Sequence, residues 1–489
     1  MKRNLPRRRW IVARRRFISL PCFTVLAVLF PLVMSPLAMA SAAAGRAAVQ
    51  EAARLLPVSW RLTGERFELR FEGVEDGEYR VSRSLTPAKV VIDAAVPWDQ
   101  KSFEVRFDDP AIPKVRFGSG PLGTRVVIEL GYLLPPPSVV SGRGTVVVSL
   151  QRVFHTVDVT YVAPGVEFGQ VRGGGAQGPF RATFLRVDLH RPGVRVYPAL
   201  AGERFGLEPV SRAAARLGAL GAVNGGFFDW TGRPLGLLIL DGQLVSEDIY
   251  GRTAFGIRED GTPFISRLSV SLWLEGPEGE KLPLDGINRL RASFREAVAY
   301  TSHYGRLPAA RGARLYLWDG VVLSEQEWRE VPEGGLVIEF DPADRRFSEV
   351  LPGQRWRLEY ALSPDPGGPV RAALGAGPAL LIDGEVRITG VEERFQRDVL
   401  ASRAPRTALG LTGDGKLLLV VVDGRAEGFS SGMTLEELAA FMKELGAVSA
   451  MNLDGGGSAT LVVSGRVLSR PSGSAERAVA SLLLVEAGR

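Results

Sequence analysis

The chain has 489 residues, of which 45% are hydrophobic and 23% charged, a composition typical of globular proteins and a length that suits two or three domains. Its formal net charge is +6, but residues 1–40 contain eight basic residues and no acidic one, which leaves about −2 for the rest. The bulk of the chain is therefore not basic, and this excludes an electrostatic argument for nucleic-acid binding.

Cysteine and histidine are scarce. The one cysteine, Cys22, lies in the first 40 residues, so the rest of the chain has neither disulfides nor a thiolate nucleophile. The three histidines are widely spaced and give little support to a zinc site or a His-based triad: His155, His190 and His303. This inventory requires no cofactor. Any metal would be a hard divalent cation, such as Ca²⁺ or Mg²⁺, held by Asp and carbonyl oxygens.

Residues 1–40 have the pattern of an export signal. An Arg-rich start precedes the apolar run 23–30, and Ala38-Met39-Ala40 fits an A-x-A cleavage site. The stretch is short for a membrane-spanning helix and two prolines interrupt it; a retained N-terminal anchor is the alternative. The arginines at 14–16 also fit a twin-arginine pattern. We expect export to the periplasm, the cell envelope or the exterior.

Residues 58–150 predict a small all-β domain of sandwich type. Arg66–Phe71 alternates with period two, and Gly, Pro and Asp turns separate it from four further strand-like runs: 89–93, 101–107, 124–130 and 145–150. The runs 67–71, 87–93 and 124–130 resemble an AMIN domain, the β module that localises cell-envelope enzymes. The resemblance implies binding to peptidoglycan or to envelope polysaccharide.

A connecting segment near 151–180, which ends in a Gly-rich loop, leads into a second domain whose bounds we place at 154–486. Two strands and a helix-prone stretch at 209–220 open this domain. Thr434 and Glu437 predict a capping box for a later helix with a core-facing apolar stripe. With its Asp-Gly hairpin signals, the domain is predicted to be strand-rich α+β with few helices.

Two units recur in this second domain. Leu217–Asn224 is echoed by Leu445–Asn452, and each copy follows a helix-like stretch and ends in Asn before a Gly/Asp turn. Arg252–Ile257 is echoed by Arg406–Leu411, and each is followed by an Asp-Gly turn. The repeat predicts two half-domains around a pseudo-twofold axis. We therefore expect both Asn turns to converge on one site.

The second Asn turn is the strongest local signal, Asn452-Leu453-Asp454-Gly455-Gly456-Gly457-Ser458. Three consecutive glycines let backbone N–H groups approach an anion such as phosphate closely, with Asp454 at the mouth of the loop. A tight hairpin turn is the alternative. The loop is not a Walker loop, because Gly-Lys-Ser/Thr is absent, and Ser458 lacks the flanking pattern of a nucleophile elbow.

The first Asn turn, Asn224-Gly225-Gly226-Phe227-Phe228-Asp229, supplies a second carboxylate. A bulge around a satisfied core Asn is the alternative. Arg406, followed by Thr407, recurs as Arg252; a guanidinium can grip phosphate bidentately, although a lone Arg at a strand start is often structural. Asp423-Gly424-Arg425 ends the apolar run 417–422, which is a common place for a site and also for an ordinary turn.

These residue types suit hydrolysis of a sugar-1-phosphodiester. Glycoside hydrolysis usually employs two carboxylates, and their separation decides between retention and inversion. A phosphomonoester leaves as a stabilised anion and needs little protonation, so Arg and backbone N–H groups would stabilise it while one carboxylate attacks or activates water.

Eight blocks of the second domain occur in a characteristic order: 222–229, 287–289, 299–301, 377–378, 405–410, 422–425, 452–458 and 469–477. Together they resemble the phosphodiester glycosidase family, of the N-acetylglucosamine-1-phosphodiester α-N-acetylglucosaminidase or "uncovering enzyme" type. Ala404 and the short glycine run at 375–378 depart from its pattern. The resemblance implies release of a sugar and a phosphomonoester, and the export signal and AMIN-like module favour a phosphodiester-linked envelope glycan as substrate.

We expect Asp454 to be the key carboxylate, Asp229 its partner, and Arg406 to lie on the phosphate. The remaining predicted substrate contacts are Asn224, Gly225, Gly226, Thr407, Asp423, Gly424, Arg425, Asn452, Gly455, Gly456, Gly457 and Ser458. Two alternatives stay open: a non-catalytic envelope protein that binds glycan, and an architectural envelope protein in which the AMIN-like module is the working part.

Overall fold

The computed structural model describes residues 58–324 and 326–488. Apart from Val58 and Ser59, these all belong to one compact unit, Trp60–Arg489. Strands dominate throughout, as predicted, and the α-helices within these residues are short: α2 (Val210–Arg216), α3 (Arg397–Ala401) and α4 (Leu435–Glu444). The predicted export signal lies outside the described residues. None of the helices described is both long and apolar enough to cross a bilayer.

Residues 58–151 form two antiparallel sheets. The first has the order β1 (Val58–Leu62), β2 (Arg66–Glu72), β9 (Thr145–Gln151) and β8 (Ser138–Gly142). The second has the order β3 (Tyr79–Leu85), β4 (Ala88–Ala94), β7 (Gly123–Glu129), β6 (Lys114–Gly120) and β5 (Phe103–Arg106). Alternate residues point into a shared core, where Trp60 of one sheet packs on Phe117 of the other with ring centroids 5.0 Å apart. The sequence pattern therefore identified β2, β4, β5, β7 and β9 correctly and missed β1, β3, β6 and β8.

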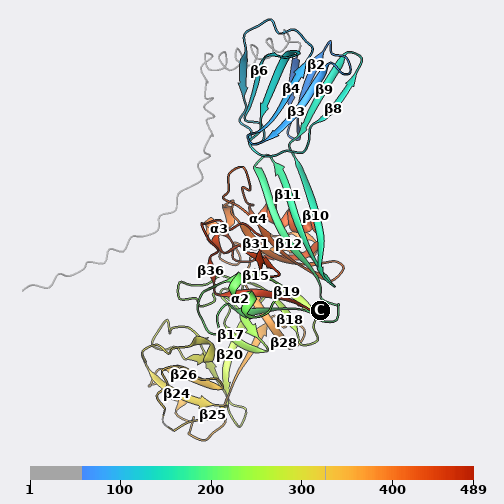
Figure 1. The fold of residues 1–489 in the computed structure, drawn as a ribbon. Coiled ribbons are helices and arrows are strands. Elements are labelled where there is room, and N and C mark those ends of the chain that lie inside the picture. The colour runs from blue at the N-terminus through green and yellow to red at the C-terminus, as the bar shows by residue number, and fades with distance from the viewer. Residues whose placement is uncertain (1–57, 325, 489) are drawn as a thin grey trace, which may run out of the picture. The chain divides into compact units, whose positions relative to one another are not determined.

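An eight-stranded sheet carries the second Asn turn. Its order is β10 (Phe154–Ala163), β11 (Val166–Gly175), β12 (Gly178–Asp188), β32 (Lys416–Val422), β31 (Arg406–Thr412), β33 (Ala447–Asn452), β29 (Ala379–Ile382) and β30 (Glu385–Val386). Figure 1 shows β10, β11 and β12 as long neighbouring strands. Both faces of this sheet are covered: Leu418 and Val420 pack with α4, whereas Leu417 and Leu419 face the core on the other side. This burial explains the continuous apolar run of β32.

The segment near 151–180 is not a connector that ends in a loop, as we predicted, because β10 and β11 span most of it. Its glycines are strand residues on which aromatic rings lie. A Cβ on Gly169 would collide with the ring of Phe184, and one on Gly173 with the ring of Phe180. These glycines provide room for side chains of the neighbouring strand rather than flexibility.

A five-stranded sheet carries the first Asn turn, in the order β13 (Val194–Leu200), β37 (Ser481–Ala487), β15 (Gly221–Asn224), β34 (Leu461–Val463) and β35 (Arg466–Val467). A two-stranded ladder pairs β14 (Glu208–Pro209) with β36 (Ala478–Val479). The C-terminal strand β37 lies between β13 and β15, so residues from both ends of the second domain build this sheet.

Three further sheets complete the fold. One has the order β17 (Gln243–Ser246), β16 (Leu238–Leu240), β28 (Val370–Gly375), β18 (Thr253–Arg258) and β19 (Pro263–Arg267); the next is β21 (Lys281–Leu284), β20 (Ser269–Glu275) and β27 (Arg357–Ser363). The last is β22 (Gly286–Ile287), β23 (Val298–Thr301), β26 (Gly335–Phe340), β24 (Ala313–Trp318) and β25 (Val321–Val322), with short 3₁₀ turns η1 (Ser302–Tyr304) and η2 (Arg345–Phe347) nearby in the chain.

The local signals for α4 and the hairpins are confirmed. The Thr434 hydroxyl accepts the Glu437 N–H at 3.3 Å, and the Glu437 carboxylate accepts the Thr434 N–H at 3.0 Å. Leu435, Leu438 and Met442 are buried along one side of α4, as its apolar stripe predicts. In both hairpins the Asp and the Gly have positive φ, which is the geometry of a type I′ turn: Asp241-Gly242 and Asp383-Gly384.

Candidate active site

The two Asn turns lie in contact. Each Asn ends its strand, Asn224 in β15 and Asn452 in β33. The Asn224 side-chain amide donates to the Asp454 carbonyl oxygen at 2.6 Å, and the Asp454 N–H donates to the Gly225 carbonyl at 3.2 Å. Asn224 Oδ1 in turn accepts the Thr407 hydroxyl at 2.7 Å and the Thr460 N–H at 3.1 Å. Asn224 therefore ties the first turn, β31 and the glycine loop together.

Asn452 is equally buried but makes a different set of bonds. Its amide donates to the Gly377 carbonyl at 3.1 Å and to the Leu453 carbonyl at 2.6 Å. Its Oδ1 atom is buried and, among the residues that the structure describes, has no hydrogen-bond partner. Both Asn side chains thus position backbone around Asp454, and neither has a free amide N–H for a ligand in this geometry.

Asp454 lies at the start of the glycine loop and is partly exposed, directly after the buried Leu453. The Gly455 N–H donates to Asp454 Oδ1 at 2.9 Å, and the chain then forms a 3₁₀ turn, η3 (Gly456–Ser458). Burial of the carboxyl group raises its pKa to about 6, while Ser458, Arg477 and the Gly455 N–H act in the opposite direction. Asp454 is thus a carboxylate with increased basicity that is still mostly ionised at neutral pH.

Two arginines border the glycine loop. One guanidinium nitrogen of Arg425 lies 3.5 Å from where a Cβ on Gly456 would be, and Arg425 is exposed. Arg477 is also exposed; its Nη1 lies 3.4 Å from the Ser458 hydroxyl, and its guanidinium stands 5.2 Å from the centre of the Phe228 ring. An anion at the loop would therefore meet two cations beside Asp454.

Arg425 was among the predicted contacts, but Arg477 and Phe228 were not singled out as site residues. Arg477 lies in a polar, Ser-rich segment with no local motif of its own, so only its membership of the block 469–477 pointed to it. Arg477 directly precedes β36, whose pairing with the distant β14 is a long-range contact that no local sequence pattern reveals.

The glycines of both turns mainly permit close packing. A Cβ on Gly225 would press on Ser481, one on Gly226 on the Gly375 carbonyl, and one on Gly455 on the Pro405 carbonyl. Gly456 has φ +59, a conformation that favours glycine. Among the loop glycines, Gly457 has Arg477 as its near neighbour and Gly456 has Arg425, so these two face the cations.

Asp423 and Gly424 directly follow the end of β32, on the side of the glycine loop. Asp423 is buried; its Oδ1 accepts the Arg470 N–H at 2.8 Å, and its carbonyl accepts the Ser430 hydroxyl at 2.6 Å. Burial raises the pKa of Asp423 to about 6, opposed by the Arg470 N–H and the nearby arginines. Gly424 lies against the Pro405 nitrogen, which leaves no room for a side chain there.

Arg406 does not occupy the predicted place on a phosphate. Its side chain is 4% exposed, Nε donates to the Met433 carbonyl at 3.0 Å, and Nη2 donates to the carbonyls of Val399 and Ser402. Burial lowers its pKa to about 10, so it remains a cation at neutral pH. The guanidinium holds the segment around α3 against the start of α4. The arginines beside the glycine loop are instead Arg425 and Arg477.

Asp229 also differs from its predicted place beside Asp454. One oxygen accepts the N–H groups of Thr231 and Arg233 at 2.9 and 3.2 Å and the Thr231 hydroxyl, and the other accepts Arg233 Nε at 3.1 Å. These hydrogen bonds lower the pKa of Asp229 against the opposing effect of burial. The carboxylate closes its own turn, and its cavity is shared with Tyr304 and Arg289.

A second cluster of polar and aromatic side chains surrounds the buried Glu393. Glu393 is fully buried and accepts the Thr253 N–H at 2.9 Å and the Thr253 hydroxyl at 2.6 Å, and it contacts the site of Gly377. Arg252, the echo of Arg406, stacks on Phe395 with its guanidinium 3.9 Å from the ring centre. The two echoed arginines thus have different environments, which the sequence repeat did not predict.

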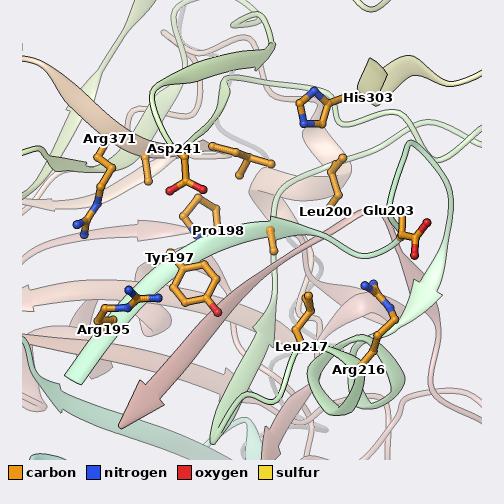
Figure 2. A pocket seen from close by; sticks show the side chains of 14 residues that line it. Arg195, Tyr197, Pro198, Leu200, Glu203, Arg216, Leu217, Asp241, His303 and Arg371 are labelled. Atoms are coloured by element: carbon orange, nitrogen blue, oxygen red, sulfur yellow. The ribbon is translucent and has the colours of Figure 1, made fainter. Parts of the chain in front are cut away.

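Five cavities lined by described residues do not include Asp454. Figure 2 shows a cavity of about 380 Å³ with Arg195 and Tyr197 of β13 at its wall, together with Arg371 and His303; none of the predicted site residues lines it. Within residues 58–324 and 326–488, no group of three or more His, Cys, Asp or Glu side chains is arranged to hold a metal ion.

The geometry places one carboxylate beside two exposed guanidinium groups on a strand-rich fold. Residues 320–486, about a third of the chain, match the model of the phosphodiester glycosidase family, so this part of the chain is similar to that family. Mouse N-acetylglucosamine-1-phosphodiester alpha-N-acetylglucosaminidase is 28% identical over 265 residues, which is 54% of this chain and 35% of that relative. The chain thus spans about a third of the length of this relative.

Two solved structures share the fold. A hypothetical protein from Synechocystis is similar with a TM-score of 0.60 and 22% identity, covering 88% of this chain and 80% of the other. A protein from Burkholderia pseudomallei, provisionally described as exported, is similar with a TM-score of 0.55 and 22% identity, covering 72% of this chain and 99% of the other. At this identity they support the fold alone.

Proposed function

We propose that the protein hydrolyses a sugar-1-phosphodiester and releases free sugar and a phosphomonoester. The observation that carries the proposal is Asp454, an ionisable carboxylate on a glycine loop bordered by the exposed guanidinium groups of Arg425 and Arg477. The loop lies inside the segment that matches the phosphodiester glycosidase family. The mouse relative's name, a glucosaminidase acting on N-acetylglucosamine-1-phosphodiesters, supports the same reaction class.

In this reaction the bond between the anomeric carbon and the phosphate oxygen breaks. The phosphomonoester keeps the electron pair and leaves as an anion that Arg425 and Arg477 stabilise. Asp454 either accepts a proton from the attacking water, or attacks the anomeric carbon to form a glycosyl ester that water then hydrolyses to release the sugar and the carboxylate. Because the leaving group needs no proton, one basic carboxylate suffices, which agrees with the engagement of Asp229 in its own turn. Arg406, Asn224 and Asn452 act by positioning backbone.

The context we propose is the cell envelope. The export pattern in residues 1–40 and the AMIN-like strands of residues 58–150 support delivery to the envelope and binding of peptidoglycan or polysaccharide there. The substrate would then be a phosphodiester-linked envelope glycan. We also infer that the two contacting Asn turns descend from one duplicated unit with pseudo-twofold symmetry, which the matched sequences and their contact support.

Incubation of the purified protein with UDP-GlcNAc and a panel of other sugar-1-phosphodiesters tests the reaction. We expect free sugar and a phosphomonoester in equal amounts, identified by mass spectrometry. Formation of sugar-1-phosphate instead would contradict a glycosidase, because the phosphate-side bond would have broken. Binding without any turnover of the panel would favour the alternative, a non-catalytic glycan-binding protein of the envelope.

The rate should depend on pH through Asp454. Because its pKa is about 6 and the ionised form is the reactive one, kcat/KM should fall about tenfold per pH unit below that value and level off above it. Arg477 lowers this pKa, so Arg477→Ala should move the acid limb to higher pH. Asp423 also has a pKa of about 6, and Asp423→Asn, which can still accept the Arg470 N–H, should leave the limb in place. If the acid limb of the kcat/KM profile disappeared in Asp423→Asn, Asp423 rather than Asp454 would be the group whose ionisation controls the rate.

A further inference from the structure

Two arginine side chains share one aromatic ring beside the candidate active site. The guanidinium carbon of Arg181, in β12, lies 4.3 Å from the centre of the Phe429 ring, and that of Arg470 lies 4.7 Å from the same centre. Phe429 is in the loop after β32, and Arg470 follows β35. Three segments far apart in sequence thus place two cations and a ring together.

Neither guanidinium group is neutralised by a direct partner. Among the residues that the structure describes, no side-chain hydrogen bond or ion pair engages Arg181 or Arg470, whereas the neighbouring Arg172 is paired with Asp158 at 3.0 Å. Asp423 accepts the backbone N–H of Arg470 and interacts with both guanidinium groups only through space, without a side-chain hydrogen bond to either. Stacking on an aromatic face holds a guanidinium flat and leaves its N–H edge available for an oxyanion.

Arg470 and Phe429 lie on the same two segments as the arginines at the glycine loop. The loop after β32 begins with Asp423, Gly424 and Arg425, and the Arg425 side chain lies beside Gly456. Phe429 belongs to the same loop. The segment after β35 contains Arg470, and the hydroxyl of Ser472 in the same segment lies 3.5 Å from the Gly456 carbonyl. Further along this segment, Arg477 reaches Ser458. The two segments that bring Arg425 and Arg477 to Asp454 therefore also place Arg470 and Phe429 next to them.

We propose that Arg181, Phe429 and Arg470 form a second anion-binding subsite, and that the substrate carries repeated phosphodiester groups along a chain. One phosphodiester would lie at Asp454, between Arg425 and Arg477, and a neighbouring one on the Arg181–Arg470 pair. The inference rests on the proposed function and deepens it, because a compound with a single phosphodiester leaves the second pair of cations without a partner. The enzyme would thus act within or along an anionic polymer.

Two probes separate this subsite from the reaction itself. One is the methyl phosphodiester of GlcNAc-1-phosphate, and the other is a GlcNAc-1-phosphate dimer that carries two phosphodiester groups. We expect kcat/KM of the unchanged protein to be about tenfold higher for the dimer, the size expected of one or two exposed charge contacts. This preference should vanish at about 1 M salt, where charges are screened beyond roughly 3 Å. Arg181→Ala and Arg470→Ala should abolish it and leave the rate on the single phosphodiester unchanged.

Arg466→Ala is the matched control, because Arg466 is also an exposed arginine of the C-terminal segment. Equal rates on both probes, or a preference that persists in the double variant Arg181→Ala/Arg470→Ala, would overturn the subsite. If neither probe is hydrolysed, the proposed function fails on them, and titration calorimetry still tests the subsite. Dimer binding that is about tenfold weaker in the double variant supports it, and unchanged binding overturns it.

Discussion

Asp454→Asn should reduce kcat by about 10²–10⁴-fold with little change in fold stability. Asn keeps the shape of the side chain and can still accept the Gly455 N–H at Oδ1, so the loop should keep its conformation. What is lost is the ability to take up a proton or to attack carbon, and Arg477 and Ser458 cannot replace it. The loss should appear as parallel disappearance of free sugar and phosphomonoester by mass spectrometry.

The matched control is Asp383→Asn. Asp383 is an exposed residue of a type I′ hairpin, where Asn is as acceptable as Asp, so both activity and thermal midpoint should stay unchanged. If Asp454→Asn kept most of its activity while remaining folded, the basic carboxylate would have to be sought elsewhere, and Asp423, whose pKa is also raised to about 6, would be the next candidate.

The sequence predicted the elements whose pattern is local. Alternation identified β2, β7 and β9, the capping box located the start of α4, and the Asp-Gly pairs located the hairpins. It failed at β10 and β11, because glycine was interpreted as flexibility. There the glycines accept the rings of Phe184 and Phe180 from the next strand, a tertiary contact that no local pattern contains.

For the candidate site, the similarity of the two sequences led us to expect that the two Asn turns meet, and they are in contact. Which side chains face the space between them depends on packing. Arg406 and Arg425 are both arginines next to a strand end, yet one is surrounded by carbonyls and the other is exposed beside Gly456. Asp229 has the residues of its own turn as partners, and these follow it closely enough that an Asx-type closure could have been anticipated.

Arg406→Ala should lower the free energy of unfolding by about 3 kcal/mol, because it leaves three carbonyl groups without their charged donor. Those carbonyls belong to Val399, Ser402 and Met433, so α3 should detach from the start of α4 before the rest of the domain unfolds. Arg406→Lys keeps the charge but not the fork that reaches separate acceptors, and we expect roughly half the loss. Urea unfolding measures both, and Arg466→Ala should stay within about 0.5 kcal/mol of the unchanged protein.

Activity distinguishes this role from a contact with phosphate. A buried guanidinium whose Nε and Nη2 donate to backbone affects catalysis only through the position of Pro405, whose carbonyl accepts the Gly456 N–H at 2.8 Å. Folded Arg406→Lys at low temperature should therefore keep kcat/KM within a few-fold, whereas Arg425→Lys, at an exposed guanidinium beside the glycine loop, should lose more, about tenfold, because Lys cannot bind phosphate bidentately. If Arg406→Lys lost more kcat/KM than Arg425→Lys, Arg406 would be the residue that binds the phosphate. Substrate binding would then have to free its side chain from the three carbonyls.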